Sequence, residues 1–235
     1  MFTRQAFDSE LKQLENKLLE MGAVVEGMVA DSVEALVKRD LNLAEEVIFR
    51  DDEVDEMDID IEHHCLRLLA LQQPMASDLR IIGTAMKMIT DIERVGDYSV
   101  DIAKSARKLA REPGYEPMID VPKLAHVARK MLRESLEAFV NRDLEMVQRV
   151  CDQDDEVDAL YREMRGQLLQ QMTDDPAKVV TGSWLLLVAH YLERVADHAT
   201  NIVERVWFMQ TGKLDHLAKT HKSGSLEDQT SDGIR

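Results

Sequence analysis

An internal repeat constrains the fold of this chain more than any other feature. The segment KRDLNLAEEVIFRDDEVD, residues 38–55, aligns with NRDLEMVQRVCDQDDEVD, residues 141–158. A second pair, DIERVGDYSVDI at residues 91–102 and YLERVADHATNI at residues 191–202, follows in the same order. Similar segments repeated in one order predict two copies of one structural unit, each of about a hundred residues.

The two copies meet at a joint that is rich in proline. The sequence REPGYEPMIDVP, residues 111–122, contains three prolines and a glycine, and helices must end in such a stretch. We therefore expect two related halves, 1–112 and 121–212. The remaining residues, 213–235, are polar and lack apolar periodicity, which predicts a flexible tail.

The composition and the apolar spacing predict helices almost throughout. Leu, Ala, Glu, Met and Arg dominate, and the 235 residues include 10 Gly and 5 Pro, a composition typical of helical proteins. Apolar residues alternate three and four positions apart, as in helices that pack along a seam. We therefore predict an all-α fold of two repeated three-helix bundles. The six long helices are expected at 4–38, 40–72, 77–111, 121–140, 144–172 and 177–211.

Charge and cysteine content exclude several classes of protein. The net charge of -16 argues against a nucleic-acid binder, because neutralising phosphates requires clustered Lys and Arg. Cys65 and Cys151 form no CxxC pair and are best explained as buried thiols in a reducing compartment.

The N-terminal sequence lacks the apolar core of a signal peptide. The longest apolar stretch, residues 179–192, is too short to span a bilayer. We expect a cytoplasmic protein.

Acidic side chains recur at every fourth position in the third helix of each half. Residues four apart lie on one side of a helix, about 6 Å apart along its axis. Like charges at this spacing destabilise a helix slightly, so a compensating partner is expected. The repeated positions are Glu93, Asp97 and Asp101 in the first half, and Glu193, Asp197 and Asn201 in the second.

The second helix of each half adds a further pair of carboxylates. Asp51 and Asp154 occupy positions where the apolar spacing predicts an inward-facing residue, and Asp55 and Asp158 follow one turn later. Half-buried carboxylates are costly unless they pair with cations or bind metal. Oxygen ligands favour hard cations. A solvated acidic edge is the alternative, neutralised by the nearby arginines, which are Arg50, Arg94, Arg149 and Arg194.

Other chemistries find less support in the sequence. Ferritin-like di-iron enzymes require Glu-x-x-His on two helices, and no histidine here has a glutamate three residues before it. No nucleophile–base set, glycine-rich phosphate loop or zinc motif stands out. His190 and His198 are interpreted as helix-surface or hydrogen-bonded core residues, with a ligand role for either as the alternative. His63 and His64 are expected to be exposed and without partners.

These motifs resemble a known family over nearly the whole chain, up to about Gln210. RDDEVD followed by ERVGDYSVDIAK, and DQDDEVD followed by ERVADHATNIVER, closely resemble the PhoU family of phosphate-specific transport accessory proteins. The resemblance implies two three-helix bundles with pseudo-twofold symmetry and metal clusters held by (Glu/Asp)-x-x-x-Asp motifs. One implied cluster consists of Asp51, Asp55, Glu93 and Asp97, and the other of Asp154, Asp158, Glu193 and Asp197. Asn201 fits the continuation of the family motif, whereas Asp101 departs from it and adds a charge.

The resemblance also implies a function, a cofactor class and partners. Such a protein is a negative regulator of phosphate uptake and of the phosphate-starvation response. It links a phosphate ABC transporter to a membrane sensor histidine kinase and catalyses no reaction. Its metal is a divalent or trivalent ion, namely iron, manganese, magnesium or zinc, and a homodimer is expected. The alternative function is a metal-dependent enzyme or metal-storage protein built on a helical bundle.

Overall fold

Helices account for nearly all of the residues that the computed structural model describes, which are 4–72, 75–112, 116–214 and 217. No strand occurs among these residues, so the predicted all-α class is confirmed. The elements are α1 (Arg4–Lys38), α2 (Leu41–Phe49), α3 (Asp51–Gln72), α4 (Ala76–Leu109), α5 (Val121–Asn141), α6 (Leu144–Asp174), the short 3₁₀ helix η1 (Pro176–Lys178) and α7 (Val179–Thr211).

One predicted helix is interrupted. The second helix of the first half divides into α2 and α3 at Arg50, where the hydrogen bond from Val54 N to Arg50 O lengthens to 3.4 Å. The Arg50 side chain donates to Asp31 of α1 at 2.9 Å. In the second half, Gln153 donates to Glu134 at the equivalent place, at 2.7 Å, and α6 continues without interruption. The repeat therefore preserves this contact between helices while changing its chemistry.

The starts of α2 and α6 show the repeat in the backbone. Asp40 and Asp143 each accept two backbone N–H bonds at the beginning of these helices, as N-cap residues do. The preceding residues, Arg39 and Arg142, both have positive φ angles, 55° and 57°. This left-handed conformation is uncommon for residues other than glycine. Its occurrence at both equivalent positions indicates that the turn belongs to the repeated unit.

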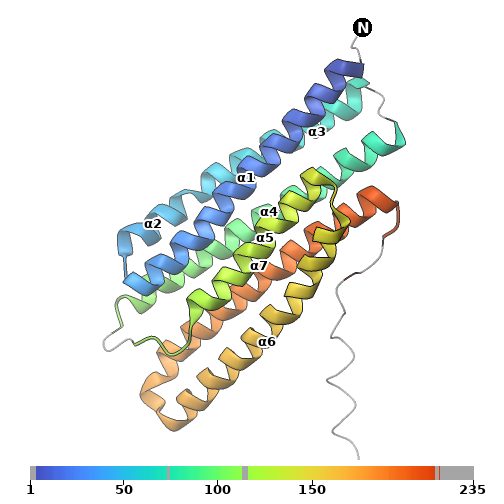
Figure 1. Cartoon of the computed structure of the whole chain (residues 1–235). Helices are drawn as coiled ribbons and strands as arrows, with labels where there is room; N and C mark the ends of the chain where they lie inside the picture. Colours follow the sequence, from blue (N-terminus) through green and yellow to red (C-terminus); the bar gives the residue numbers. More distant parts are fainter. Residues whose placement is uncertain (1–3, 73–74, 113–115, 215–216, 218–235) are drawn as a thin grey trace, which may run out of the picture.

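The halves meet along two helix pairs. The helices of each half contact one another, and contacts between the halves run through α4 with α7 and through α1 with α5. Figure 1 shows α4 and α7 running together through the middle, with α3 and α6 toward opposite edges. Exchanging α1, α3 and α4 with α5, α6 and α7 preserves this pattern of neighbours, which is the arrangement expected of pseudo-twofold symmetry.

One continuous hydrophobic core extends through both halves. The apolar members of the predicted seams are buried, and so are Cys65 and Cys151, whose thiol pKa values burial raises to about 12. The helices α1 and α5 approach closely at Gly22, where a Cβ atom would lie 2.1 Å from Leu136 Cδ1. The prediction that His64 is exposed is wrong. It is buried, and its Nε2 lies 3.0 Å from Glu10 of α1, a neighbour distant in sequence.

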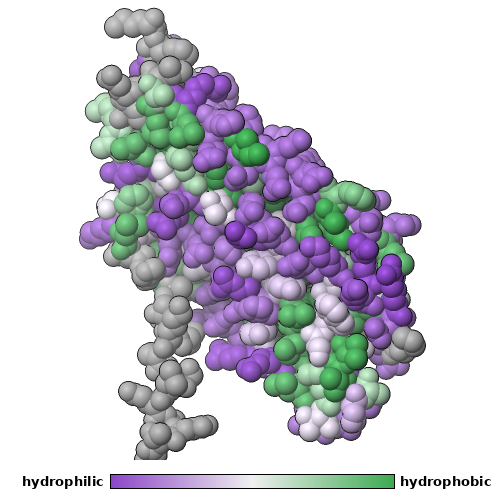
Figure 2. All heavy atoms as spheres, turned by 180° about the vertical axis from the view of Figure 1, so that it is seen from behind, coloured by the Kyte–Doolittle hydropathy of each residue, from purple (hydrophilic) through white to green (hydrophobic). Residues whose placement is uncertain are grey.

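One face of the molecule is mainly hydrophilic. Figure 2 shows a face on which polar residues predominate, with hydrophobic side chains gathered mainly toward its two ends. None of the described helices is both long and apolar enough to cross a membrane. The predicted tail, residues 213–235, falls largely outside the described residues, and its flexibility stays a prediction.

Candidate metal centres

The structure brings the first set of predicted carboxylates together between α3 and α4. Asp51 is the first residue of α3 and is half-buried. Burial raises its pKa, and the negative charges of Asp55 on the same helix and Asp97 on α4 raise it further. Burial likewise raises the pKa of Glu93, and Asp97 adds to the effect. Four carboxylates from two neighbouring helices therefore repel one another at one place.

Asp58 is a fifth carboxylate of this cluster, and the predicted set does not include it. It lies on α3, and burial raises its pKa, assisted by the charges of Glu62 and Asp55. Its own charge contributes to the raised pKa of Glu93. The sequence feature that could have identified Asp58 is its position in the apolar seam, where a carboxylate is unusual. The equivalent residue of the second half is Tyr161, so the two clusters differ in charge.

The second cluster lies between α6 and α7. The pKa values of its carboxyl groups are shifted further than those of the first cluster. Burial raises the pKa of Asp154 to about 6, and Asp197 and Asp158 add to the shift. The pKa of Glu193 rises to about 7 through burial and the charge of Asp197. Thr200 donates a hydrogen bond to Asp154 Oδ1 at 3.4 Å. This site therefore retains protons near neutral pH when it contains no cation.

An arginine pairs with one aspartate of each cluster, and the charge of Lys104 further offsets the raised pKa of Asp51. Arg94 donates to Asp97 at 2.9 Å, and Arg194 donates to Asp197 at 2.6 Å. The alternative of an acidic edge paired with arginines is thus partly realised. Neutralisation is incomplete, because Glu193 Oε2 is buried without a hydrogen bond among the described residues, although His190 Nδ1 lies 3.1 Å away.

The last residue of each acidic ladder lies elsewhere. Asn201 donates to Asp91 of α4 at 3.2 Å. Asp101 lies 3.4 Å from Lys104 Nζ. Burial raises the pKa of Tyr191 of α7, and the negative charge of Asp101 raises it further. Positions 101 and 201 therefore face the seam between α4 and α7 rather than the two clusters. A part for Asp101 and Asn201 in metal binding stays a prediction.

That central seam contains two cross-pairs of different chemistry. His198 Nδ1 lies 2.8 Å from Asp91 Oδ1, and both side chains are largely buried. Tyr98 and Tyr191 stack with their ring centroids 5.9 Å apart. Position 91 corresponds to 191 in the repeat, and 98 corresponds to 198. The pseudo-twofold relation therefore exchanges a tyrosine pair with an aspartate–histidine pair.

The donor set of the two clusters suits a hard cation. It consists of carboxylate oxygens, which such ions prefer. The buried, unbonded oxygen of Glu193 is an acceptor that a cation would satisfy. Within the described ranges, no three Asp, Glu, His or Cys side chains converge as a ready coordination shell. Binding an ion would therefore require side-chain rotations.

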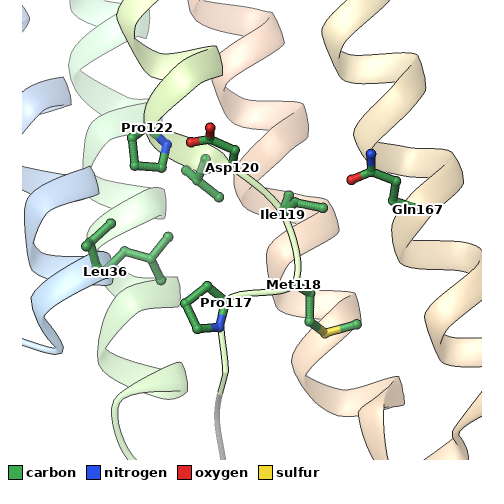
Figure 3. Close-up of a pocket in the computed structure, with 9 residues that line it drawn as sticks. Leu36, Pro117, Met118, Ile119, Asp120, Pro122 and Gln167 are labelled. Carbon is green, nitrogen blue, oxygen red and sulfur yellow. The ribbon is translucent and has the colours of Figure 1, made fainter.

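A mainly apolar pocket lies away from the carboxylate clusters. It has a volume of about 510 Å³ and is bordered by the linker between the halves, with Leu36 of α1 and Gln167 of α6 on its sides. Figure 3 shows Pro117, Met118 and Ile119 of the linker along this pocket. Its lining includes one carboxylate, Asp120, which caps α5. The pocket offers no donor set for a metal.

The raised pKa values predict how the stability of the metal-free protein depends on pH. A carboxyl group whose pKa is raised in the folded state binds its proton more tightly there than in the unfolded chain. Such a group lowers the stability of the folded state once the pH exceeds its ordinary pKa, which is 4.5 for Glu193. The loss of stability is complete above the pKa of the folded state, which is about 7. We therefore expect metal-free protein to melt a few degrees lower at about pH 8 than at about pH 5.

A variant separates this effect from the titration of the rest of the chain. Glu193→Gln should remove part of the loss of melting temperature between these pH values, measured by circular dichroism. Glu156→Gln, which changes an exposed glutamate of α6, is the matched control and should follow the wild type. If both variants gave the wild-type pH profile, repulsion at Glu193 would not contribute to stability.

Comparisons with known proteins agree with the repeat and the fold. The family model described as the PhoU domain matches the chain twice, at residues 18–106 and 121–206. A relative from Clostridium acetobutylicum, described as a phosphate-specific transport system accessory protein PhoU homolog, is 41% identical over 212 residues, covering 90% of this chain and 97% of the relative. A relative of the same description from Pseudomonas aeruginosa is 34% identical, covering 95% of this chain and 93% of its own.

Two solved structures have the same architecture. The crystal structure of PhoU from Pseudomonas aeruginosa has a TM-score of 0.84 and 35% sequence identity, covering 88% of this chain and 100% of that chain. The phosphate transport system regulatory protein PhoU from Streptococcus pneumoniae has a TM-score of 0.81 and 31% identity, covering 89% of this chain and 99% of its own. The similarity extends through both halves.

Proposed function

Because this chain belongs to the PhoU family, we propose that it is an accessory protein of phosphate-specific transport that restrains phosphate uptake when phosphate is plentiful. The observation that carries the proposal is the extent of the similarity: relatives described as PhoU homologues match about nine-tenths of the chain at up to 41% identity. Their descriptions name accessory or regulatory proteins, not enzymes.

The proposed mode of action is that of an adaptor. One part of the surface would bind subunits of a phosphate ABC transporter, and another would bind a sensor histidine kinase, so that the kinase remains off while transport proceeds. A homodimer would present each surface twice. The long helices and the single continuous core support a rigid scaffold, and the mainly polar face in Figure 2 is available for such contacts.

We further propose that the two acidic clusters bind metal ions. The residues that would hold them are Asp51, Asp55, Glu93 and Asp97, with Asp58 beside them, and Asp154, Asp158, Glu193 and Asp197. A bound cation would neutralise their repulsion and join α3 to α4 and α6 to α7. The raised pKa values of Asp154 and Glu193 support this role, because burial and the negative charge of Asp197 raise them, and a bound cation would offset both.

Deletion of the gene tests the regulatory role. We expect a reporter of phosphate-starvation genes to remain expressed in phosphate-rich medium in the deletion strain, because the restraint on the response is lost. A plasmid copy of the wild-type chain should restore repression. Normal repression in the deletion strain, together with unchanged uptake of labelled phosphate, would refute the proposal.

A further inference from the structure

A second charged site lies at one end of the seam between α4 and α7, in a chain whose overall charge is strongly negative. It is a cavity of about 350 Å³, near the lower limit of the range of about 300–1,000 Å³ for small-molecule sites. Its lining includes four cationic side chains from the C-terminal end of α4 and the residues after it, and two aromatic side chains of α7. These are Lys104, Arg107, Lys108, Arg111, Trp184 and Tyr191.

The cations are only partly neutralised. Arg107 lies 3.1 Å from Glu45, and Lys104 lies 3.4 Å from Asp101, the carboxylate of the cavity lining. No side-chain ion pair involves Lys108 or Arg111 among the residues that the structure describes. The cavity therefore has positive charge available for an anion.

The repeat shows that these cations are not a requirement of the helix. Basic residues near a helix C-terminus can be explained by the helix dipole alone. The equivalent end of α7 has no basic residue in its last turn. Its residues at the four corresponding positions are Glu204, Trp207, Phe208 and Thr211. The basic cluster is therefore specific to one half, whereas the carboxylate clusters occur in both.

The opposite wall of the cavity indicates which kind of anion fits. Trp184 and Tyr191 are seven residues apart, and both line the cavity. Aromatic side chains of this kind stack on flat rings, and Arg and Lys recognise phosphoryl oxygens. The first half has Thr84 and Asp91 at the corresponding positions of α4, so the aromatic wall, like the cations, occurs once.

We propose that this cavity binds a nucleoside phosphate, with the base against Trp184 and Tyr191 and the phosphoryl group among the cations. The lining of the cavity shares no residue with the acidic clusters, although the charge of Lys104 partly offsets the raised pKa of Asp51. Inorganic phosphate shares the phosphoryl chemistry, but it would leave the aromatic wall without a partner. A nucleotide should therefore bind more tightly than phosphate alone.

Tryptophan fluorescence locates the binding, because the chain has 2 tryptophans. AMP is titrated into metal-stripped full-length protein, so that no ion on the acidic clusters can bridge to the phosphate. The variant Trp207→Phe retains Trp184, and its fluorescence should be quenched by AMP. The variant Trp184→Phe retains Trp207, and its fluorescence should not change. Absence of quenching in the first variant, or equal quenching in both, would overturn the proposal.

Calorimetry tests the contribution of the cations. The double variant Lys108→Ala, Arg111→Ala should bind AMP at least about tenfold more weakly than wild type, since charged hydrogen bonds are lost. Lys87→Ala, Lys123→Ala changes the net charge equally at exposed positions elsewhere and should bind normally. Inorganic phosphate should bind the wild type at least about tenfold more weakly than AMP. Equal loss in both variants, or equal affinity for phosphate and AMP, would overturn the proposal.

Discussion

The variant Asp97→Ala, Asp197→Ala is expected to lose most metal uptake while retaining its helical circular-dichroism spectrum. Each substitution removes the carboxylate whose charge raises the pKa of neighbours in its own cluster, Asp51 in the first and Asp154 in the second. It also removes the partner of Arg94 or Arg194, leaving a cation that repels an incoming metal ion. Elemental analysis after incubation with iron, manganese, magnesium or zinc, followed by desalting, measures the loss.

Melting experiments provide a second measure of the same effect. A ligand at about a hundred times its Kd stabilises the folded state by about 2.7 kcal/mol, which raises the melting temperature by several degrees. We expect this rise in the wild type and not in the double variant. Glu53→Ala, Glu156→Ala removes exposed glutamates at equivalent positions of the repeat and should respond as the wild type does. Equal metal content and equal melting shifts in all three proteins would exclude the cluster interpretation.

Phe139→Ala is expected to destabilise the protein more than any of the surface or cluster substitutions. Phe139 of α5 is fully buried, with 0% of its surface exposed, in the core that joins the two halves. Removing a buried phenyl ring costs about 3–5 kcal/mol, because transfer energy is lost and a cavity remains. The melting temperature should fall by about 10 °C, since each kcal/mol corresponds to about 2–4 °C at this chain length.

A phenylalanine on the surface supplies the control. Phe49, the last residue of α2, is 68% exposed, and Phe49→Ala should change the stability by no more than about 0.5 kcal/mol. Because one core joins the halves, the Phe139→Ala variant should still unfold in a single transition. Two separate transitions, or equal losses for the two variants, would contradict this account of the core.

The sequence alone was sufficient for the helices and for eight carboxylates of the two clusters, because both follow from periodicity. Spacing of three and four marks the buried side of a helix, so Asp51 and Asp154 were recognisable as polar residues on an apolar seam. Spacing of four then placed Glu93 with Asp97 on one side of their helix. Repetition of both patterns in the second half strengthened each inference.

Features that depend on other helices could not be read in this way. The pairing of Arg50 with Asp31 and the burial of His64 beside Glu10 both depend on α1. Asp58 acquires its role only because α3 lies against α4. The positions of Asp101 and Asn201 follow from helix geometry. Eight residues rotate a helix about 80° beyond two full turns, which turns Asp101 and Asn201 toward the seam.

At the seam between α4 and α7, the two halves contribute different side chains to each contact. Asp91 meets His198 across it, and Tyr98 meets Tyr191. If two copies of the first half were joined in the same way, an aspartate would face a tyrosine at both places. If two copies of the second half were joined, a tyrosine would face a histidine at both places. The aspartate–histidine contact forms only between a first half and a second half. The side chains at this seam therefore favour the pairing of a first half with a second half over the pairing of two identical halves.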